Sequence, residues 1–200
     1  MVYHISETPG IKVLIPKVST HKKAYVYGIE NLVTGLLFGV GKDDFDFMIY
    51  TDDEDRPHIC ECYPDGMRKK YAGRSCSVYE LPEEGFLRGM TSWSAELVSP
   101  QEVRVERETA VPDLYQRLLE EEEKGTLVIH RYQDSPEYRK MISEHIVDRL
   151  IRFDILKGDW EKDERFAGCY RPIIEALLSV TDGHLLCREK KITRETILPF

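Results

Sequence analysis

The order of apolar and polar positions divides the chain into a strand-rich first half and a helix-rich second half. Short β-branched or aromatic runs bounded by Pro, Gly or Asp indicate strands, and apolar residues three or four positions apart indicate helices. Strands are expected at residues 2–3, 11–15, 24–27, 44–50, 58–63, 75–81, 94–98, 103–105 and 126–132. In the run 44–50, Phe45, Phe47 and Ile49 alternate with other residues and are expected on one face.

Helical spacing predicts one helix in the first half and three in the second. The first follows Asn31, and the next begins at Pro112-Asp113 and ends at Gly125. A third begins at Ser135 with Pro136 in its first turn and ends at Gly158. Its inward stripe is expected to hold Ile142, Ile146, Leu150 and Phe153.

The last predicted helix spans 166–180, where Pro172 bends or restarts it, and the charged tail beyond is expected to be peripheral. These elements predict an α+β protein. A strand-rich domain over residues 1–108 carries the function, and a mainly helical region over residues 109–200 packs on it.

Composition narrows the class of protein. The chain has 200 residues, of which 42% are hydrophobic, and no apolar run approaches the roughly 20 residues of a membrane span. The start lacks the basic and apolar regions of a secretion signal, and five cysteines without framework spacing suit a reducing cytoplasm. A net charge of −8 argues against nucleic acid and favours small molecules or basic proteins as partners. The sequence does not indicate an oligomeric state.

Three common kinds of functional site lack support. Cys60 and Cys62 stand on alternate positions of a predicted strand, but no second pair at zinc spacing accompanies them, so no metal site is predicted. The chain contains no Gly-x-Ser-x-Gly elbow. Its GLLFGVGK stretch matches neither a phosphate-binding Walker loop nor a dinucleotide fingerprint.

Four fragments carry a family resemblance, in the order YHIS, AYVYGIENL, SVYELPEEGF and AELVSPQEV. Together they resemble the ADP-ribosyltransferase superfamily, and most closely the small branch of rifampin ADP-ribosyltransferases and RNA 2′-phosphotransferases. The positions that match the family's motifs are His4, Tyr27 (or Tyr25) and Glu96. The resemblance covers roughly residues 1–106. It implies an ADP-ribosyltransferase-like split β-sheet domain.

The resemblance also implies a chemistry. NAD would be the co-substrate, and a small molecule or a protein would accept ADP-ribose. In the family the histidine holds the ribose, the tyrosine packs against the nicotinamide, and the acidic residue binds the ribose 2′-hydroxyl. A carboxylate there stabilises the positive charge that develops as the nicotinamide–ribose bond breaks. Glu83, Glu84 and Glu102 compete with Glu96 for the acidic role.

Each site residue also has a simpler interpretation. His4 can be a half-buried histidine bonded to a backbone carbonyl, Tyr27 a core residue, and Glu96 a solvated carboxylate. Ile5-Ser6 stands where the family usually has Gly-Thr, which favours a catalytically inactive nucleotide- or partner-binding module on the same fold. An RNA-directed relative is a further alternative, against which the net acidity counts. A toxin or antitoxin role also stays open.

Overall fold

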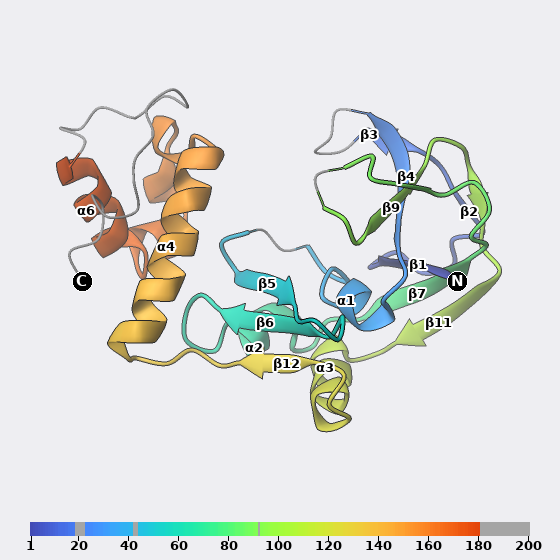
Figure 1. The fold of residues 1–200 in the computed structure, drawn as a ribbon, viewed down its shortest axis with the longest axis horizontal. Coiled ribbons are helices and arrows are strands. Elements are labelled where there is room, and N and C mark those ends of the chain that lie inside the picture. The colour runs from blue at the N-terminus through green and yellow to red at the C-terminus, as the bar shows by residue number, and fades with distance from the viewer. Residues whose placement is uncertain (19–22, 42–43, 92, 181–200) are drawn as a thin grey trace. The chain divides into compact units, whose positions relative to one another are not determined.

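The computed structural model describes residues 1–18, 23–41, 44–91 and 93–180, and it is an α+β protein (Figure 1). The chain forms two compact units. The described residues of unit 1 fall within 1–42, 49–59 and 67–129, and those of unit 2 within 43–48, 60–66 and 130–200. Among the described helices, none has the length and apolarity needed to cross a membrane.

Unit 1 is built on a seven-stranded sheet of order β11-β7-β1-β4-β9-β8, with β3 paired to β4. Its strands are β1 (Val2–Ser6), β3 (Lys17–Val18), β4 (Ala24–Ile29), β7 (Cys76–Leu81), β8 (Leu87–Arg88), β9 (Glu96–Ser99) and β11 (Arg107–Val111). β1 pairs antiparallel with β7 along its whole length, from Val2↔Leu81 to Ser6↔Ser77. On its other side β1 pairs antiparallel with β4, in the register Tyr3↔Ile29. The short strands β2 (Val13–Leu14) and β10 (Val103–Arg104) form a separate antiparallel pair.

One face of this sheet carries an apolar core made by alternate residues of neighbouring strands. The core consists of Val2, Leu14, Val26, Tyr79, Leu81, Leu97 and Val103. β4 approaches this core closely because Gly28 lacks a side chain. A Cβ at that position would lie 2.3 Å from Cγ1 of Val2.

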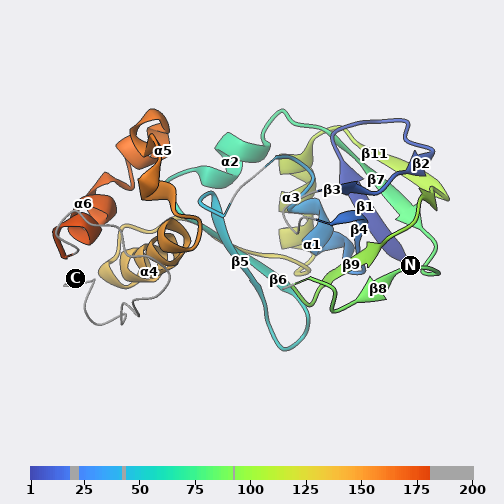
Figure 2. The same cartoon turned by 90° about the horizontal axis from the view of Figure 1, so that it is seen from above.

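Helices cover the opposite side of the strands, where α1 (Leu32–Leu36) lies beside β1 and β4, and α3 (Leu114–Glu123) packs beside α1 (Figure 2). Asn31 caps α1 by accepting a hydrogen bond from the Thr34 amide at 3.0 Å, and Asp113 caps α3 in the same way. Gly35 permits the approach of α1, since a Cβ there would lie 2.5 Å from Cδ1 of Ile5. The helix predicted after Asn31 and the one predicted from Pro112-Asp113 are thus both present.

A three-stranded sheet of order β12-β6-β5 contains β5 (Phe47–Thr51), β6 (Pro57–Glu61) and β12 (Val128–His130). The strand predicted over 44–50 is wrong at its start, because residues 44–46 form a turn. Phe45 therefore does not continue a strand face with Phe47 and Ile49. Its carbonyl instead accepts a hydrogen bond from the Tyr170 hydroxyl at 2.5 Å, within unit 2.

Unit 2 is helical and contains α4 (Pro136–Arg152), η1 (Ile155–Lys157), η2 (Trp160–Lys162), α5 (Glu164–Ala167) and α6 (Arg171–Val180). α4 and α6 lie side by side (Figures 1 and 2). Ile142, Ile146 and Leu150 are buried, as the predicted stripe requires. Phe153 is 47% exposed, so its predicted inward position is wrong. α4 ends before Gly158 because Asp154 adopts a left-handed conformation with φ of 52°.

Other differences concern short elements and boundaries. The sequence patterns did not predict α2 (Gly66–Tyr71), β8 or β11, and the predicted boundary after residue 108 lies inside β11. Pro172 stands in the first turn of α6, so the predicted helix over 166–180 is divided into α5 and α6. The charged tail lies outside the described residues.

Candidate functional site

His4 lies on β1, where its ring bonds to the neighbouring strand β4. Its Nδ1 is 2.9 Å from the backbone carbonyl oxygen of Tyr27. A carbonyl only accepts, so Nδ1 carries the proton and Nε2 of the neutral ring is an acceptor. Burial lowers the pKa of His4, the hydrogen bond to Tyr27 opposes this shift, and the charge of Lys17 lowers the pKa further. The ring is therefore neutral at pH 7 and presents a hydrogen-bond acceptor.

Tyr27 and Glu96 come from the adjacent strands β4 and β9. The register pairs Tyr27 with Val98 and Ile29 with Glu96, which makes Tyr27 and Glu96 diagonal neighbours on one face. Burial raises the pKa of Tyr27, and the negative charge of Glu96 contributes next, since the two side chains are close. Tyr25 stands two positions earlier, and its ring meets that of Tyr27 edge to face at 6.2 Å.

His4, Tyr27 and Glu96 line one cavity of about 200 Å³, here called the His4 cavity. Its other lining residues are Tyr3, Ile5, Gly28, Ile29, Gly35, Phe38 and Trp93. Three of the four predicted site residues thus border one cavity. Strand alternation nevertheless directs the His4 side chain to the sheet face of Tyr79, opposite the face that carries Tyr27 and Glu96. Phe38 and Trp93 were missed by the sequence analysis, although their ring centroids lie 5.1 Å apart at a tilt of 41°. Phe38 follows α1 and Trp93 stands three residues before Glu96, and no spacing rule connects these positions.

A second cavity of about 540 Å³ also reaches His4 and Tyr27, and we call it the Lys17 cavity. Tyr25 lines this cavity. Its polar lining includes the hydroxyl residues Ser6 and Thr8 and the cation Lys17; the remaining lining residues are Ile11, Val13, Leu14, Ile15, Val18 and Val26. His4 and Tyr27 therefore separate an aromatic and acidic space from one that contains a positive charge.

Tyr79 and Glu108 hold the loop that borders the Lys17 cavity. The Tyr79 hydroxyl donates to the carbonyl of Thr8 at 2.6 Å and accepts from the amide of Ile11 at 3.3 Å. Oε1 of Glu108 accepts from the amide of Gly10 and from the Ser77 hydroxyl, both at 2.8 Å. The hydrogen bond from the Gly10 amide, followed by that from Ser77, lowers the pKa of Glu108. The loop is thereby tied to β7 and β11.

The competing glutamates occupy different settings. Glu83, Glu84 and Glu102 are exposed, and Glu83 accepts a hydrogen bond from the N-terminal amine. Glu96 is half-buried and lines the His4 cavity. Of these four glutamates, Glu96 is the one that lines the cavity bordered by His4 and Tyr27.

The two cysteines considered for metal binding are both buried. Burial raises the pKa of Cys60 to about 11 and raises that of Cys62 further, so both thiols are protonated at neutral pH. In the part of the chain that the structure describes, no three or more His, Cys, Asp or Glu side chains are grouped to hold a metal ion.

Comparison with protein-family models, with curated proteins and with solved structures gives no match for this chain. Its function is therefore inferred from the residues themselves. The His4 cavity combines a carboxylate with aromatic rings and is bordered by a neutral histidine, and the cavity beside it contains a cation.

Proposed function

We propose that unit 1 is an ADP-ribosyltransferase-like domain that binds NAD and transfers ADP-ribose to a small molecule or a protein. One observation carries this proposal. The residues that match the family's three motifs stand on three different strands, and they line the same cavity.

The hydrogen-bonding groups of His4 fit the ribose of NAD. A neutral His4 offers Nε2 as an acceptor, and a ribose hydroxyl can donate to it. The hydrogen bond from Nδ1 to Tyr27 fixes the tautomer and the ring orientation, so the acceptor is held in position before the ligand arrives. His4 would therefore contribute to binding in the ground state and in the transition state alike.

Glu96 would supply electrostatic stabilisation. Breaking the nicotinamide–ribose bond develops positive charge on the ribose, and a partly buried carboxylate stabilises that charge more than water does. Tyr27, Phe38 and Trp93 provide aromatic faces for the nicotinamide ring. These three rings would orient the bond to be broken towards the Glu96 carboxylate.

The Lys17 cavity would receive the charged part of the dinucleotide. Lys17 lies close enough to His4 to lower its pKa, and Ser6 and Thr8 add hydroxyl groups to the same lining. A cation beside two hydroxyl groups favours phosphate oxygens, and the apolar remainder of the cavity favours a base. The proposal thus uses both cavities that meet at His4 and Tyr27.

The test is a binding assay followed by a search for cleavage. NAD at millimolar concentration should raise the melting temperature of the full chain, because a ligand that binds only the folded state stabilises it. Mass spectrometry should then detect nicotinamide release in the presence of candidate acceptors. ADP-ribose and nicotinamide, offered separately, would show which part of the dinucleotide is bound. The absence of any shift with all three ligands would contradict NAD binding.

A second candidate is a module that binds a nucleotide or a partner without catalysis. The volume of the His4 cavity favours it, because about 200 Å³ is below the usual range for ligand pockets. Ile5-Ser6 at the end of the first motif supports the same candidate. A thermal shift with NAD, combined with no nicotinamide release from any acceptor mixture, would favour this module over the transferase.

A further inference from the structure

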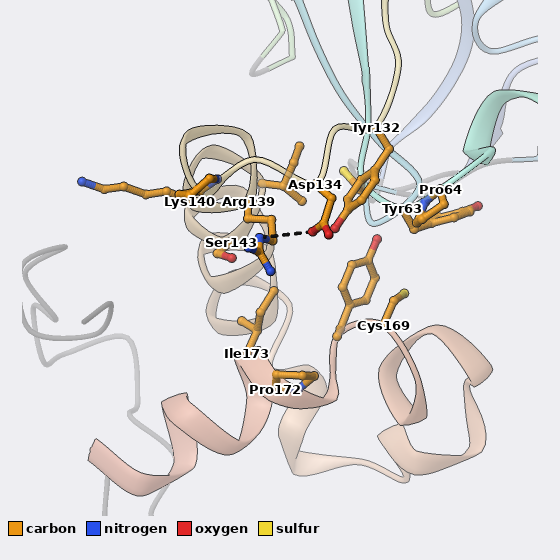
Figure 3. Close-up of a pocket in the computed structure, with 14 residues that line it drawn as sticks. Tyr63, Pro64, Tyr132, Asp134, Arg139, Lys140, Ser143, Cys169, Pro172 and Ile173 are labelled. Carbon is orange, nitrogen blue, oxygen red and sulfur yellow. Dashed lines mark ion pairs between the residues drawn. The ribbon is translucent and has the colours of Figure 1, made fainter. Parts of the chain in front are cut away.

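Unit 2 contains a cavity of its own, of about 500 Å³, here called the Arg139 pocket (Figure 3). Its lining residues are Cys62, Tyr63, Pro64, Tyr132, Asp134, Pro136, Arg139, Lys140, Ile142, Ser143, Cys169, Tyr170, Pro172 and Ile173. The volume lies in the range of small-molecule sites, and most of the lining is apolar or aromatic. None of these residues belongs to the site proposed for NAD.

The tyrosines that line this pocket are held in place by hydrogen bonds and ring packing with residues outside it. The Tyr63 hydroxyl donates to Oδ1 of Asp46 at 3.0 Å, and the Tyr170 hydroxyl donates to the Phe45 carbonyl. Tyr132 packs edge to face on Tyr138 at 5.8 Å. Because their positions are fixed in this way, the three lining tyrosines form rigid surfaces for a flat apolar body.

Two polar groups of α4 face this space one helical turn apart, at positions 139 and 143. Ser143 is 7% exposed, and its hydroxyl makes no hydrogen bond with another described residue. A serine hydroxyl can both donate and accept a hydrogen bond, and that of Ser143 belongs to the pocket lining. Ser143 therefore offers a ligand in this pocket one hydrogen-bond donor.

Arg139 supplies the charge. Its Nε lies 3.4 Å from Oδ1 of Asp134, and both side chains are largely exposed. The guanidinium donates no hydrogen bond to another described residue, so its fork can still bind a carboxylate through two bonds. Lys140 also lines the pocket, but Figure 3 shows its side chain extending away from the other lining residues.

We propose that the Arg139 pocket binds an aromatic monocarboxylate, with the ring between the tyrosines and the carboxylate on Arg139 and Ser143. A single negative charge matches one guanidinium that Asp134 already partly neutralises. A phosphate dianion would need more donors than this helix turn supplies. This site is independent of the NAD proposal, so either can fail without the other.

The test titrates 2-naphthoate into the full chain by calorimetry, with 2-naphthylmethylammonium as a cationic probe of similar size. Arg139→Gln should weaken naphthoate binding about tenfold, because a charge-assisted bond is lost. Lys140→Gln is the matched control and should leave the affinity within about twofold, since surface charges away from a ligand contribute little. Ser143→Ala should weaken binding by a smaller factor than Arg139→Gln.

A chemical readout gives a second measurement. Cys169 is an exposed thiol in the lining, so bound naphthoate should slow its alkylation by N-ethylmaleimide. Peptide mass spectrometry measures the rate at which Cys169 is alkylated. The protection should be lost in Arg139→Gln at the same naphthoate concentration. Equal binding of the two probes, equal losses in Arg139→Gln and Lys140→Gln, or no saturable binding at millimolar naphthoate would each overturn the proposal.

Discussion

The His4 cavity and the Arg139 pocket differ in how their polar groups are held. In unit 1 the polar groups stand on paired strands, and His4 already uses one ring nitrogen to bond the neighbouring strand. In unit 2, Arg139 and Ser143 project from one helix and donate no side-chain hydrogen bond to another described residue. The first arrangement holds a reacting group in a fixed position, and the second leaves donors available for a ligand. Catalysis therefore fits unit 1 better, and simple binding fits unit 2 better.

The comparison predicts that the largest effect on activity comes from Glu96. Glu96→Gln should lower NAD-cleaving turnover by about a hundredfold or more, because it removes a charge that acts mainly in the transition state. NAD affinity, the melting temperature and naphthoate binding in unit 2 should stay close to those of the wild type. Single-turnover assays with saturating NAD measure the change.

Two further variants test whether the effect is specific to Glu96 and to the transition state. Glu84→Gln changes an exposed glutamate outside the cavity and should keep full activity. His4→Ala should instead weaken NAD binding, since His4 holds the ribose in both states. If Glu96→Gln cleaves NAD as fast as the wild type, the transferase site requires a different carboxylate.

The second prediction concerns the stability of unit 2. Asp46 is 2% exposed and bonds both Tyr63 and Nη1 of Arg165, the latter at 2.9 Å. Asp46→Asn should lower the free energy of unfolding by about 2 kcal/mol, because it weakens the charge-assisted bonds from Tyr63 and Arg165. Asp163 still pairs with the Arg165 guanidinium at 2.7 Å, so that charge is not left uncompensated. The chain has two tryptophans, Trp93 in unit 1 and Trp160 in unit 2, so their fluorescence reports the unfolding of each unit separately.

The measurement is chemical denaturation followed by tryptophan fluorescence in Trp93→Phe and Trp160→Phe backgrounds. Asp46→Asn should move the transition reported by Trp160 and leave the one reported by Trp93 nearly unchanged. Equal shifts of both transitions would mean that the two units unfold as one cooperative block.

These predictions depend on features that the sequence indicated to different degrees. The α+β class followed from short β-branched runs before residue 106 and from the stripe Ile142, Ile146 and Leu150 after it. The β11 strand, with sequence RETAV, was missed because its exposed polar residues resemble a loop and only its pairing with β7 makes it a strand. Phe45 was misplaced because alternation alone does not show where a turn ends.

The site residues show the same limit. His4, Tyr27 and Glu96 were predicted because they occur in ordered fragments that resemble a family. Phe38 and Trp93 were not, since their contact depends on how the segments after α1 and before β9 approach each other. The Arg139 pocket was missed entirely because residues near 63, 139 and 170 form it, and no local pattern connects such distant segments.

The third prediction tests the close packing of unit 1. Gly28→Ala should destabilise this unit by about 1–3 kcal/mol, because overpacking forces neighbouring side chains to shift. The added Cβ would lie 2.3 Å from Cγ1 of Val2 and 3.0 Å from Cε1 of Phe86. Gly41→Ala is a matched control, since a Cβ added there would have no atom of a described residue within 4 Å apart from its neighbours in the chain. The transition reported by Trp93 should move for Gly28→Ala alone, and an unchanged midpoint would show that β4 adjusts without cost.

The smallest expected effect is a pH dependence that one histidine contributes to each unit. Burial lowers the pKa of His4 in unit 1 and of His145 in unit 2 below the ordinary value of 6.5, and in the folded state each bonds a backbone carbonyl. Between the lowered folded pKa and 6.5, the unfolded chain binds more protons than the folded chain. Stability is therefore complete above pH 6.5 and decreases as the pH falls through the folded pKa.

Carboxylates with lowered pKa values lose their contribution only at more acidic pH, so the histidines dominate the range from neutral to about pH 5. His4→Asn places an amide donor where Nδ1 of the ring stands, so it keeps a donor for the Tyr27 carbonyl but removes the titrating group. It should flatten the pH dependence of the transition reported by Trp93 and leave that of Trp160 unchanged. His145→Gln, which keeps a donor for the Asp44 carbonyl, should do the reverse. A pH slope at Trp93 that persists in His4→Asn would show that this ring is not the group that titrates, and the neutral acceptor proposed for the ribose would lose its physical basis.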